Sequence, residues 1–288
     1  MLQSGATRAR RDNGHAIMTD EQYSIPVVMV FAGLDPTGGA GVQADIEAIA
    51  SMGGHTAPLI TALTVQDTCD VKSFTPVDAL LLVEQARAVL EDMPVHAFKL
   101  GMLGSVEVVE AVHSLLVDYP DVPVVFDPVL AAGGGQALAS PDMLDAVVSL
   151  LLPQTTVLTP NSQEARALAV GADTLDACAQ ELLSRGAEFV LITGTHENTP
   201  QVENTLYANM RKLETFTWER LPLSYHGSGC TLASAIAGLL AQGLEPFTAI
   251  YEAQEYAWET LQHGYRLGMG QALPNRLFWA RGEEDDGA

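Results

Sequence analysis

A glycine-rich segment with one thiol stands out in the last third of the chain. Residues 226–231 are His-Gly-Ser-Gly-Cys-Thr, and the small, apolar run 232–240 follows directly. This pattern predicts a loop before a buried helix, and the N-terminus of a helix presents unpaired N–H groups with a partial positive charge. Glycines let an anion approach such N–H groups closely. The segment is therefore either a phosphate cradle with Cys230 at its rim or a plain glycine-rich loop.

Other polar and glycine-rich segments follow predicted strands, each at the point where the strand ends. They are Asp35–Gly41, Gln66, Gly101–Gly104, Asp127, Asn161 with Glu164, and Gly194–His196. Because the carboxyl ends of parallel strands lie on one edge of a sheet, these segments are expected to meet at one crevice. Their convergence favours the phosphate cradle over the plain loop.

The elements that must position these residues alternate between strand and helix. Apolar, β-branched runs predict strands at 25–34, 56–65, 96–100, 122–126, 155–158 and 189–193. Helical spacing predicts helices at 40–52, 76–90, 106–117, 143–152, 162–170, 175–185, 231–242 and 246–267, and a hairpin joins 202–208 to 214–220. Such alternation predicts an α/β fold with one doubly wound, mostly parallel sheet and helices on both faces.

No linker or repeat divides the chain. We expect a single domain at 25–280, a disordered N-terminal extension at 1–24 with Met18 as an alternative start, and a solvated acidic tail at 281–288. No apolar run reaches the ~18 residues of a membrane span. The first 17 residues lack the apolar core of a secretory signal.

Composition excludes several partners. The chain has 36 acidic and 14 basic residues, a formal net charge of -22, so nucleic acid and anionic membranes are not expected to bind. Cys69, Cys178 and Cys230 form no paired motif, which argues against a zinc site or disulfide framework and favours the cytoplasm. A phosphate ligand would need a metal or focused N–H groups to offset the negative charge.

The common nucleotide-binding glycine patterns are absent: there is no GxxxxGK[ST] run, and Gly38–Gly41 lacks the GxGxxG spacing. Six segments instead resemble, in chain order, the hydroxymethylpyrimidine/phosphomethylpyrimidine kinases of thiamine biosynthesis. They are 32–45, 61–68, 99–103, 126–129, 158–165 and 226–231. The resemblance spans roughly 27–267. It implies a ribokinase-like fold (three α/β/α layers around a mostly parallel sheet), ATP with Mg²⁺, and a homodimer.

The resemblance also implies a pyrimidine pocket. Gln66 matches the glutamine that hydrogen-bonds the aminopyrimidine, and a carboxamide offers that edge both a donor and an acceptor. The other pocket residues that it implies are Gly33, Ala40, Asp45, Met102 and Val129. On the residues alone, Gln66 could instead cap a loop, Met102 could belong to the core, and Asp45 could be an ordinary acid on a helix surface.

Phosphoryl transfer is assigned by resemblance to the opening segment. Cys230 matches the residue beside the substrate hydroxymethyl group, where a thiolate could accept its proton, and a helix N-terminus is expected to lower the pKa of a cysteine. Gly227, Ser228 and Gly229 would supply N–H groups to the transferred phosphoryl. The alternative for Cys230 is a buried structural cysteine.

The nucleotide side is assigned in the same way. Asn161 and Glu164 resemble the Asn-x-x-Glu element that orders Mg²⁺ through water near the phosphates, as the oxygen ligands of Mg²⁺ allow. A helix cap by the same two residues is compatible with that role. Asp127 is expected beside the same phosphates, although it could merely end a strand. Thr193 and Gly194 are expected at the nucleotide.

One departure from the family pattern concerns charge. Many members have Lys-Gly-Gly-His where this chain has Thr-Gly-Thr-His at 193–196, so a cation that reaches the phosphates is missing. Lys99 and Arg211 are the candidates to replace it. We interpret the change as a variation and not as a loss of function, because the cradle and the Asn-x-x-Glu element are intact.

The predicted function is ATP-dependent phosphorylation of 4-amino-5-hydroxymethyl-2-methylpyrimidine and then of its monophosphate. Two alternatives stay open at this point. Pyridoxal kinase activity is one, since pyridoxal also carries a hydroxymethyl on a heteroaromatic ring, although Gln66 favours the pyrimidine. A pyrimidine-sensing pseudokinase is the other, and Thr193 is its only support.

Overall fold

A sheet of nine strands forms the centre of the computed structural model, which describes residues 25–131 and 138–280. Its order is β3-β2-β1-β4-β5-β6-β7-β8-β9. The strands are β1 (Val27–Leu34), β2 (His55–Gln66), β3 (Val71–Pro76), β4 (Val95–Leu100), β5 (Val124–Phe126), β6 (Val157–Leu158), β7 (Phe189–Ile192), β8 (Val202–Ala208) and β9 (Arg211–Trp218). Strands β2, β1, β4, β5, β6 and β7 run parallel, whereas β3, β8 and β9 are antiparallel to their neighbours.

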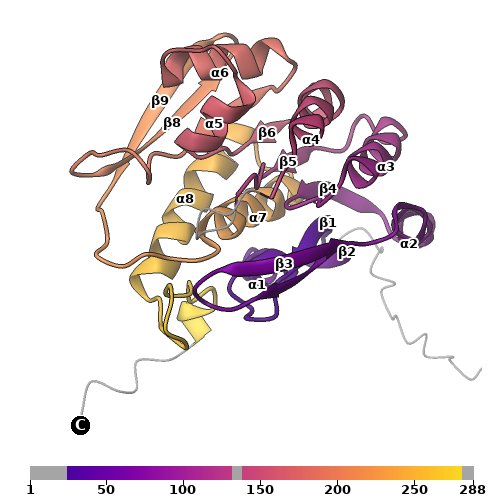
Figure 1. Ribbon diagram of the computed structural model, residues 1–288, viewed down its shortest axis with the longest axis horizontal. Helices are drawn as coiled ribbons and strands as arrows, with labels where there is room; N and C mark the ends of the chain where they lie inside the picture. The colour runs from indigo at the N-terminus through magenta and orange to yellow at the C-terminus, as the bar shows by residue number, and fades with distance from the viewer. Residues whose placement is uncertain (1–24, 132–137, 281–288) are drawn as a thin grey trace, which may run out of the picture.

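Helices cover both faces of this sheet and complete three layers (Figure 1). They are α1 (Gly41–Ser51), α2 (Ala79–Asp92), α3 (Val106–Val117), α4 (Pro141–Ala146), α5 (Ser162–Leu168), α6 (Leu175–Ser184), α7 (Ser228–Ala241) and α8 (Pro246–Gln262). One buried cluster joins the sheet to α1, α7 and α8, and a second joins the opposite face to α2, α3, α4 and α6. The expected α/β/α architecture is confirmed.

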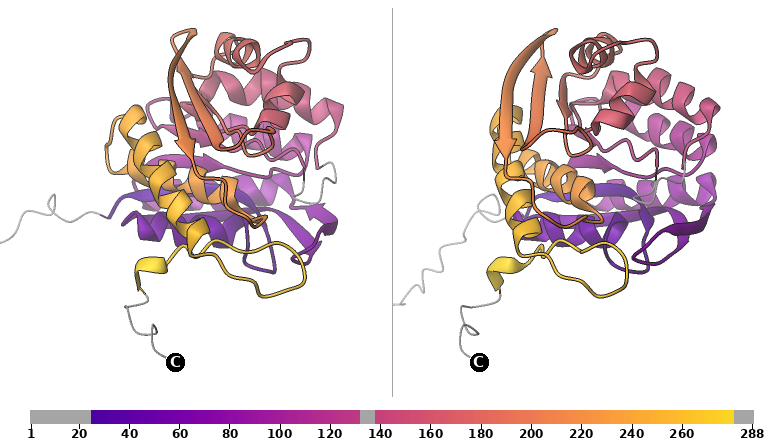
Figure 2. Two further views of the ribbon diagram at one scale, coloured as in Figure 1. Left: turned by 90° about the vertical axis from the view of Figure 1, so that its left-hand side faces the viewer. Right: turned by 60° about the vertical axis from the view of Figure 1, so that its left-hand side comes forward.

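The burial of each strand explains whether its residues form a recognisable pattern in the sequence. Strand β1 is buried along almost its whole length, so both of its faces are apolar and the run is conspicuous. Strand β3 is largely exposed and carries Lys72, Ser73 and Thr75, so its pattern gave no signal. The hairpin of β8 and β9, which is orange in Figure 2, was predicted, although β9 starts at Arg211 and not at residue 214.

Several helix predictions needed correction. The helix predicted from residue 231 begins at Ser228, so Ser228, Gly229 and Cys230 belong to its first turn. The helix predicted from residue 76 begins at Ala79, because the Asp78 side chain accepts a hydrogen bond from the Leu81 N–H and caps it. The helix predicted at 143–152 is α4 followed by a short π-helical stretch, Val147–Leu151. Helix α8 ends at Gln262, after which the chain turns and Tyr265 pairs with Leu273.

The expectations for 1–24, including Met18, and for 281–288 fall outside the described residues. Among those described, no helix has the length and apolar character needed to cross a membrane.

Candidate active site

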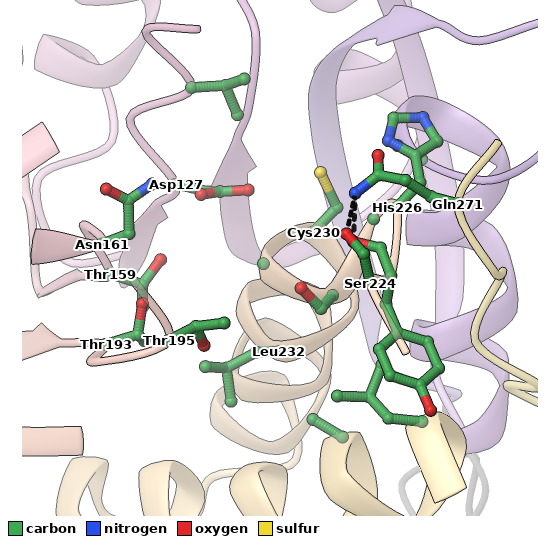
Figure 3. Close-up of a pocket in the computed structure, with 18 of the residues that line it drawn as sticks. Asp127, Thr159, Asn161, Thr193, Thr195, Ser224, His226, Cys230, Leu232 and Gln271 are labelled. Carbon is green, nitrogen blue, oxygen red and sulfur yellow. Dashed lines mark hydrogen bonds between the residues drawn. The ribbon is translucent and has the colours of Figure 1, made fainter. Parts of the chain in front are cut away.

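A cavity of about 470 Å³ lies at the edge where the parallel strands end (Figure 3). Most of the residues predicted from the sequence line it, which confirms that the strand-end segments converge. They are Gly33, Ala40, Gln66, Met102, Asp127, Val129, Asn161, Glu164, Thr193, Gly227, Ser228, Gly229 and Cys230. Two predicted residues, Asp45 and Gly194, are not part of the lining. Asp45 is fully buried, so its placement in the pocket was wrong, whereas a contact of Gly194 with the nucleotide stays a prediction.

The N-terminus of α7 opens into this cavity as the glycine spacing predicted. Gly227 is the N-cap and has a φ of 83°, a left-handed conformation that favours glycine. A Cβ there would also lie 2.0 Å from the Gly39 carbonyl oxygen, so the loop after β1 and the loop before α7 touch through their backbones. The free N–H groups of the first turn of α7 are therefore held at a narrow point where two loops meet.

A hydrogen-bonded network forms the wall beside the predicted pyrimidine site. His226 Nε2 lies 2.9 Å from Asp35 Oδ2 and 3.2 Å from Gln66 Nε2. Asp35 also accepts hydrogen bonds from the N–H groups of Thr37 and Ala40, each at 2.8 Å. Burial acts to raise the pKa of Asp35, but the hydrogen bonds from His226, Thr37 and Ala40 outweigh it and lower the pKa to about 2. Asp35 is therefore a stable carboxylate.

Sequence reasoning gave Asp35 and His226 no individual role. Both belong to segments that it singled out, and an acid two residues before Thr37 is a recognisable turn signal. What the sequence does not contain is their distance in space, since 191 positions separate them along the chain.

Asp45 lies beneath the cavity in a buried ion pair. Its Oδ1 accepts hydrogen bonds from Lys99 Nζ at 2.8 Å and from Ser234 Oγ at 2.6 Å, while its Oδ2 is buried without a partner. The prediction of a pocket residue is therefore wrong, and so is the alternative of an acid on a helix surface. The residue faces inward from α1 because Lys99 of β4 supplies a countercharge.

Lys99 is the one of the two candidate cations that reaches the cavity. Its side chain is fully buried in β4 and contributes to the cavity lining. Burial acts to lower its pKa, but the charges of Asp45 and Asp127 and the hydrogen bond to Asp45 raise the pKa above its ordinary value, so the amine stays charged. Arg211 is exposed on the hairpin and is not part of the lining.

Cys230 departs from the sequence prediction in its acidity. Its side chain is partly exposed in the cavity, and its sulfur is drawn in yellow in Figure 3. Burial and then the negative charge of Asp127 raise the pKa of the thiol to about 12, although Lys99 and the Gly41 N–H act in the opposite direction. The expected lowering by the helix N-terminus is overturned, because desolvation and a nearby carboxylate are larger effects here. Without ligands the thiol is protonated at neutral pH.

Two carboxyl groups form the opposite wall of the cavity. Asp127 is buried and its Oδ2 has no hydrogen-bond partner. Burial raises its pKa more than Lys99 and a hydrogen bond from Cys230 lower it. Burial and the charge of Asp127 likewise raise the pKa of Glu164 to about 8. This wall therefore opposes the accumulation of negative charge.

Asn161 and Glu164 form a capping box at the start of α5. Asn161 Oδ1 accepts a hydrogen bond from the Glu164 N–H at 2.9 Å, and Glu164 Oε2 accepts one from the Asn161 N–H at 2.8 Å. The capping alternative is thus confirmed, and both side chains also line the cavity.

The carboxyl wall fits a hydrated Mg²⁺ better than a metal held by protein alone. Within 25–131 and 138–280, no group of three or more His, Cys, Asp or Glu side chains is arranged to hold a metal. Asp127 and Glu164 nevertheless offer hard oxygen atoms, and Asp127 Oδ2 is buried without a hydrogen-bond partner. Mg²⁺ keeps several waters and commonly binds through one or two carboxylates together with substrate phosphates.

An apolar and aromatic region completes the cavity away from the cradle. Trp218 of β9 and Trp258 of α8 stack with ring centroids 6.3 Å apart, and both side chains contribute to the lining. Gly194 supports this region from behind, because its N–H donates to Asn204 Oδ1 at 3.1 Å and a Cβ there would lie 2.2 Å from the Glu203 carbonyl oxygen. The sequence gave no sign of this region because its residues come from distant elements.

Arg220 is a second cation in the lining that sequence reasoning missed. Its guanidinium donates to the carbonyl oxygens of Thr195, Glu197 and Thr199 at 2.8, 2.9 and 3.0 Å. It thereby fixes the loop that follows β7, where the sequence has threonine in place of lysine.

Known proteins resemble this chain over most of its length. The family profile described as phosphomethylpyrimidine kinase matches residues 35–275. A hydroxymethylpyrimidine/phosphomethylpyrimidine kinase of Mycobacterium tuberculosis is 37% identical over 88% of this chain and 94% of its own length. The structure of a Clostridium difficile phosphomethylpyrimidine kinase has a TM-score of 0.71 at 30% identity and covers 83% of this chain and 100% of its own. That of a Bacillus subtilis pyridoxal kinase with ADP has a TM-score of 0.79 at 26% identity, covering 89% and 99%.

Proposed function

The chain belongs to the phosphomethylpyrimidine kinase family, and on that premise we propose that it phosphorylates 4-amino-5-hydroxymethyl-2-methylpyrimidine and then its monophosphate, with ATP, on the way to thiamine. The observation that carries this proposal is that Gln66, Cys230 and the N-terminus of α7 line one cavity. A carboxamide for the amino edge of a ring and N–H groups for a phosphoryl group are both required by this reaction.

The substrate orientation follows from these positions. With the aminopyrimidine edge at Gln66, the hydroxymethyl group points to Cys230 and the first turn of α7. Its oxygen attacks the γ-phosphorus of ATP, a new O–P bond forms, and the bond to the β,γ-bridging oxygen breaks to release ADP. The hydroxyl proton passes to the Cys230–Asp127 pair, whose two groups share a hydrogen bond. In the second reaction a phosphate oxygen of the monophosphate takes the place of the hydroxyl.

Charge stabilisation comes from groups that are fixed before the substrates bind. The N–H groups of Gly227, Ser228 and Gly229 face the transferred phosphoryl, and Lys99 lies behind Cys230 and Asp127. Asp127 and Glu164 would hold Mg²⁺, which supplies positive charge to the ATP phosphates. Phosphoryl transfer depends mainly on positioning and charge stabilisation, so this arrangement suffices without a lysine at position 193.

We also propose a homodimer and a cytoplasmic enzyme. Leu34, Leu63 and Val65 are exposed large apolar side chains on neighbouring strands near one end of the sheet, and such a patch favours an interface. All three cysteines are free thiols, as is usual in a reducing compartment. Light scattering that gives the mass of a single chain at micromolar concentration would rule out the dimer.

An ATP-consumption assay with competing substrates tests the activity. We expect a larger kcat/KM with the hydroxymethylpyrimidine than with pyridoxal, because Gln66 matches the amino edge. Greater turnover of pyridoxal would replace the proposed substrate. Thermal stabilisation by the pyrimidine without any consumption of ATP would indicate the sensing role instead.

A further inference from the structure

Arg276 is buried outside the cavity, in the segment that follows α8. Its side chain is only 2% exposed, although the protein surface is rich in acids that could pair with a free arginine. Burying a guanidinium is costly unless its donors are satisfied. Its contacts therefore indicate what the residue is for.

The guanidinium joins three parts of the fold. Arg276 Nε donates to Thr231 Oγ1 of α7 at 2.9 Å. Its terminal nitrogens donate to the Gly38 carbonyl at 3.4 Å, to the Gly39 carbonyl, and to Glu47 Oε2 of α1 at 3.1 Å. A planar fork of five N–H donors can make all these bonds from one position, which a lysine cannot do.

The backbone of Arg276 is fixed as well. Its carbonyl oxygen accepts hydrogen bonds from Ser51 Oγ and from the Tyr256 hydroxyl, each at 2.8 Å. Side chains of α1 and α8 thus fix the backbone of Arg276, so its guanidinium extends from a rigid position.

Thr231 passes this constraint to the cradle. Its hydroxyl accepts the hydrogen bond from Arg276 and donates its own to the Gly227 carbonyl at 2.8 Å. Gly227 is the N-cap of α7, and the position of a Cβ on it would lie 2.0 Å from the Gly39 oxygen and 3.0 Å from Arg276 Nη2. The two loops and the guanidinium therefore meet at one point.

We propose that Arg276 is a positioning residue that locks the phosphoryl cradle. It holds the Gly38 and Gly39 carbonyls against the N-cap of α7 and neutralises their partial negative charge, so the N–H groups of Gly227–Gly229 keep one direction. Donors that are fixed before the reaction stabilise charge more effectively than donors that must reorganise. This role rests on the proposed kinase function.

Glu47 provides a matched control, because it contacts Arg276 but not the cradle. Glu47→Gln removes the countercharge of Arg276 and leaves the links to Gly39 and Thr231 in place. Thr231→Val removes the hydroxyl that links Arg276 to Gly227 and leaves the bonds from Arg276 to Gly38, Gly39 and Glu47 in place. The two variants separate the stability of the segment from the geometry of the cradle.

The experiment measures kcat, the KM for ATP, the Kd for the pyrimidine and the Tm of each variant. We expect Arg276→Met and Thr231→Val to lower kcat by roughly 10- to 100-fold, the scale of a misplacement near 1 Å, with the pyrimidine Kd changed less than about threefold. Arg276→Lys should fall between wild type and Arg276→Met, because it keeps charge but not the fork. Glu47→Gln should lower Tm and leave kcat near wild type.

The combined variant Arg276→Met/Thr231→Val should lose no more kcat than Arg276→Met alone, since both act through one link. Variants that lower Tm at unchanged kcat would overturn the inference and leave the kinase function standing. A wild-type protein without turnover would instead overturn the function itself. If Arg276→Met does not fold, Thr231→Val decides: an unchanged kcat contradicts the locking role, and a reduced kcat supports it.

Discussion

The two ends of the cavity treat their carboxyl groups in opposite ways. At the end that faces β1 and β2, Asp35 receives hydrogen bonds from His226, Thr37 and Ala40, and these lower its pKa to about 2. At the end that faces β5 and β6, burial and mutual repulsion raise the pKa of Glu164 to about 8, and Asp127 Oδ2 has no partner. The first end is complete within the chain, whereas the second needs a cation from outside.

This difference teaches where each substrate gains its specificity. The pyrimidine end offers a preformed wall whose charges are already balanced, so recognition of a neutral ring there depends on hydrogen bonds. The nucleotide end is poised for a positive charge, which ATP can bring only together with Mg²⁺. Lys99 and Cys230 lie between the two ends.

The largest expected effect follows from breaking the ion pair between the ends. Lys99→Met leaves the buried Asp45 carboxylate uncompensated, and breaking such a pair lowers the free energy of unfolding by about 3–5 kcal/mol. Urea denaturation measures it. The double variant Lys99→Met/Asp45→Asn should recover most of this stability but not the activity, because the cation near Cys230 is still missing. Full recovery of kcat in the double variant would show that Lys99 takes no part in the reaction.

The next effect concerns the thiol. Cys230→Ala should lower kcat by at least ~100-fold, the scale of a lost proton acceptor, while the Kd of the pyrimidine stays close to wild type. Cys69→Ala, which changes an exposed thiol, is the control and should leave kcat intact. Because the pKa of Cys230 is raised in the absence of ligands, a variant with normal kcat would show that Asp127 alone accepts the proton.

A pH series tests the pyrimidine end, where Asp35 is held as a carboxylate. The folded pKa of Asp35 lies below its ordinary value of 3.8, so the charged form adds stability that is full above about pH 4 and is lost as the pH falls toward 2. Asp35→Asn lacks this contribution. The difference in the free energy of unfolding between wild type and Asp35→Asn should be constant from pH 6 to 5 and shrink between pH 4 and 3. A difference in the free energy of unfolding that grows as the pH falls would contradict a stabilising, charged Asp35.

The smallest expected effect concerns Mg²⁺ binding at the nucleotide end. Mg²⁺ at about ten times its Kd should add ~1.4 kcal/mol of stability, or roughly 3–6 °C in Tm, through binding to the folded state. Glu164→Gln should abolish the shift. Glu181→Gln, which alters an exposed acid paired with Arg185, should keep it. An equal shift in both variants would place the metal elsewhere.

The sequence predicted what depends on local pattern. Strand β1 and helix α7 have apolar runs close to glycines, so both elements and the cradle at the N-terminus of α7 were predicted, although α7 begins at Ser228 and not at residue 231. Strand β3 was missed because its exposed residues carry no periodic signal. The segment forms a strand only because it pairs with β2.

Long-range contacts account for the failures at the site. Asp45 looked like a pocket residue or a surface acid, yet Lys99 and Ser234 draw it into the interior. The acidity of Cys230 was misjudged because burial of the thiol, and then the nearby charge of Asp127, raise its pKa. The role of Arg276 was not predicted, because the residues next to it in the sequence do not indicate its contacts with Gly39 and Thr231.

The division between the two ends is tested most directly by product analysis with and without Mg²⁺. The protein would be incubated with ATP and 4-amino-5-hydroxymethyl-2-methylpyrimidine, and the products measured by mass spectrometry alongside pyrimidine binding. We predict that the monophosphate and then the diphosphate form only with Mg²⁺, whereas the pyrimidine binds equally well without it. Phosphorylated product in the presence of excess chelator, or no product with Mg²⁺, would contradict this description of the site.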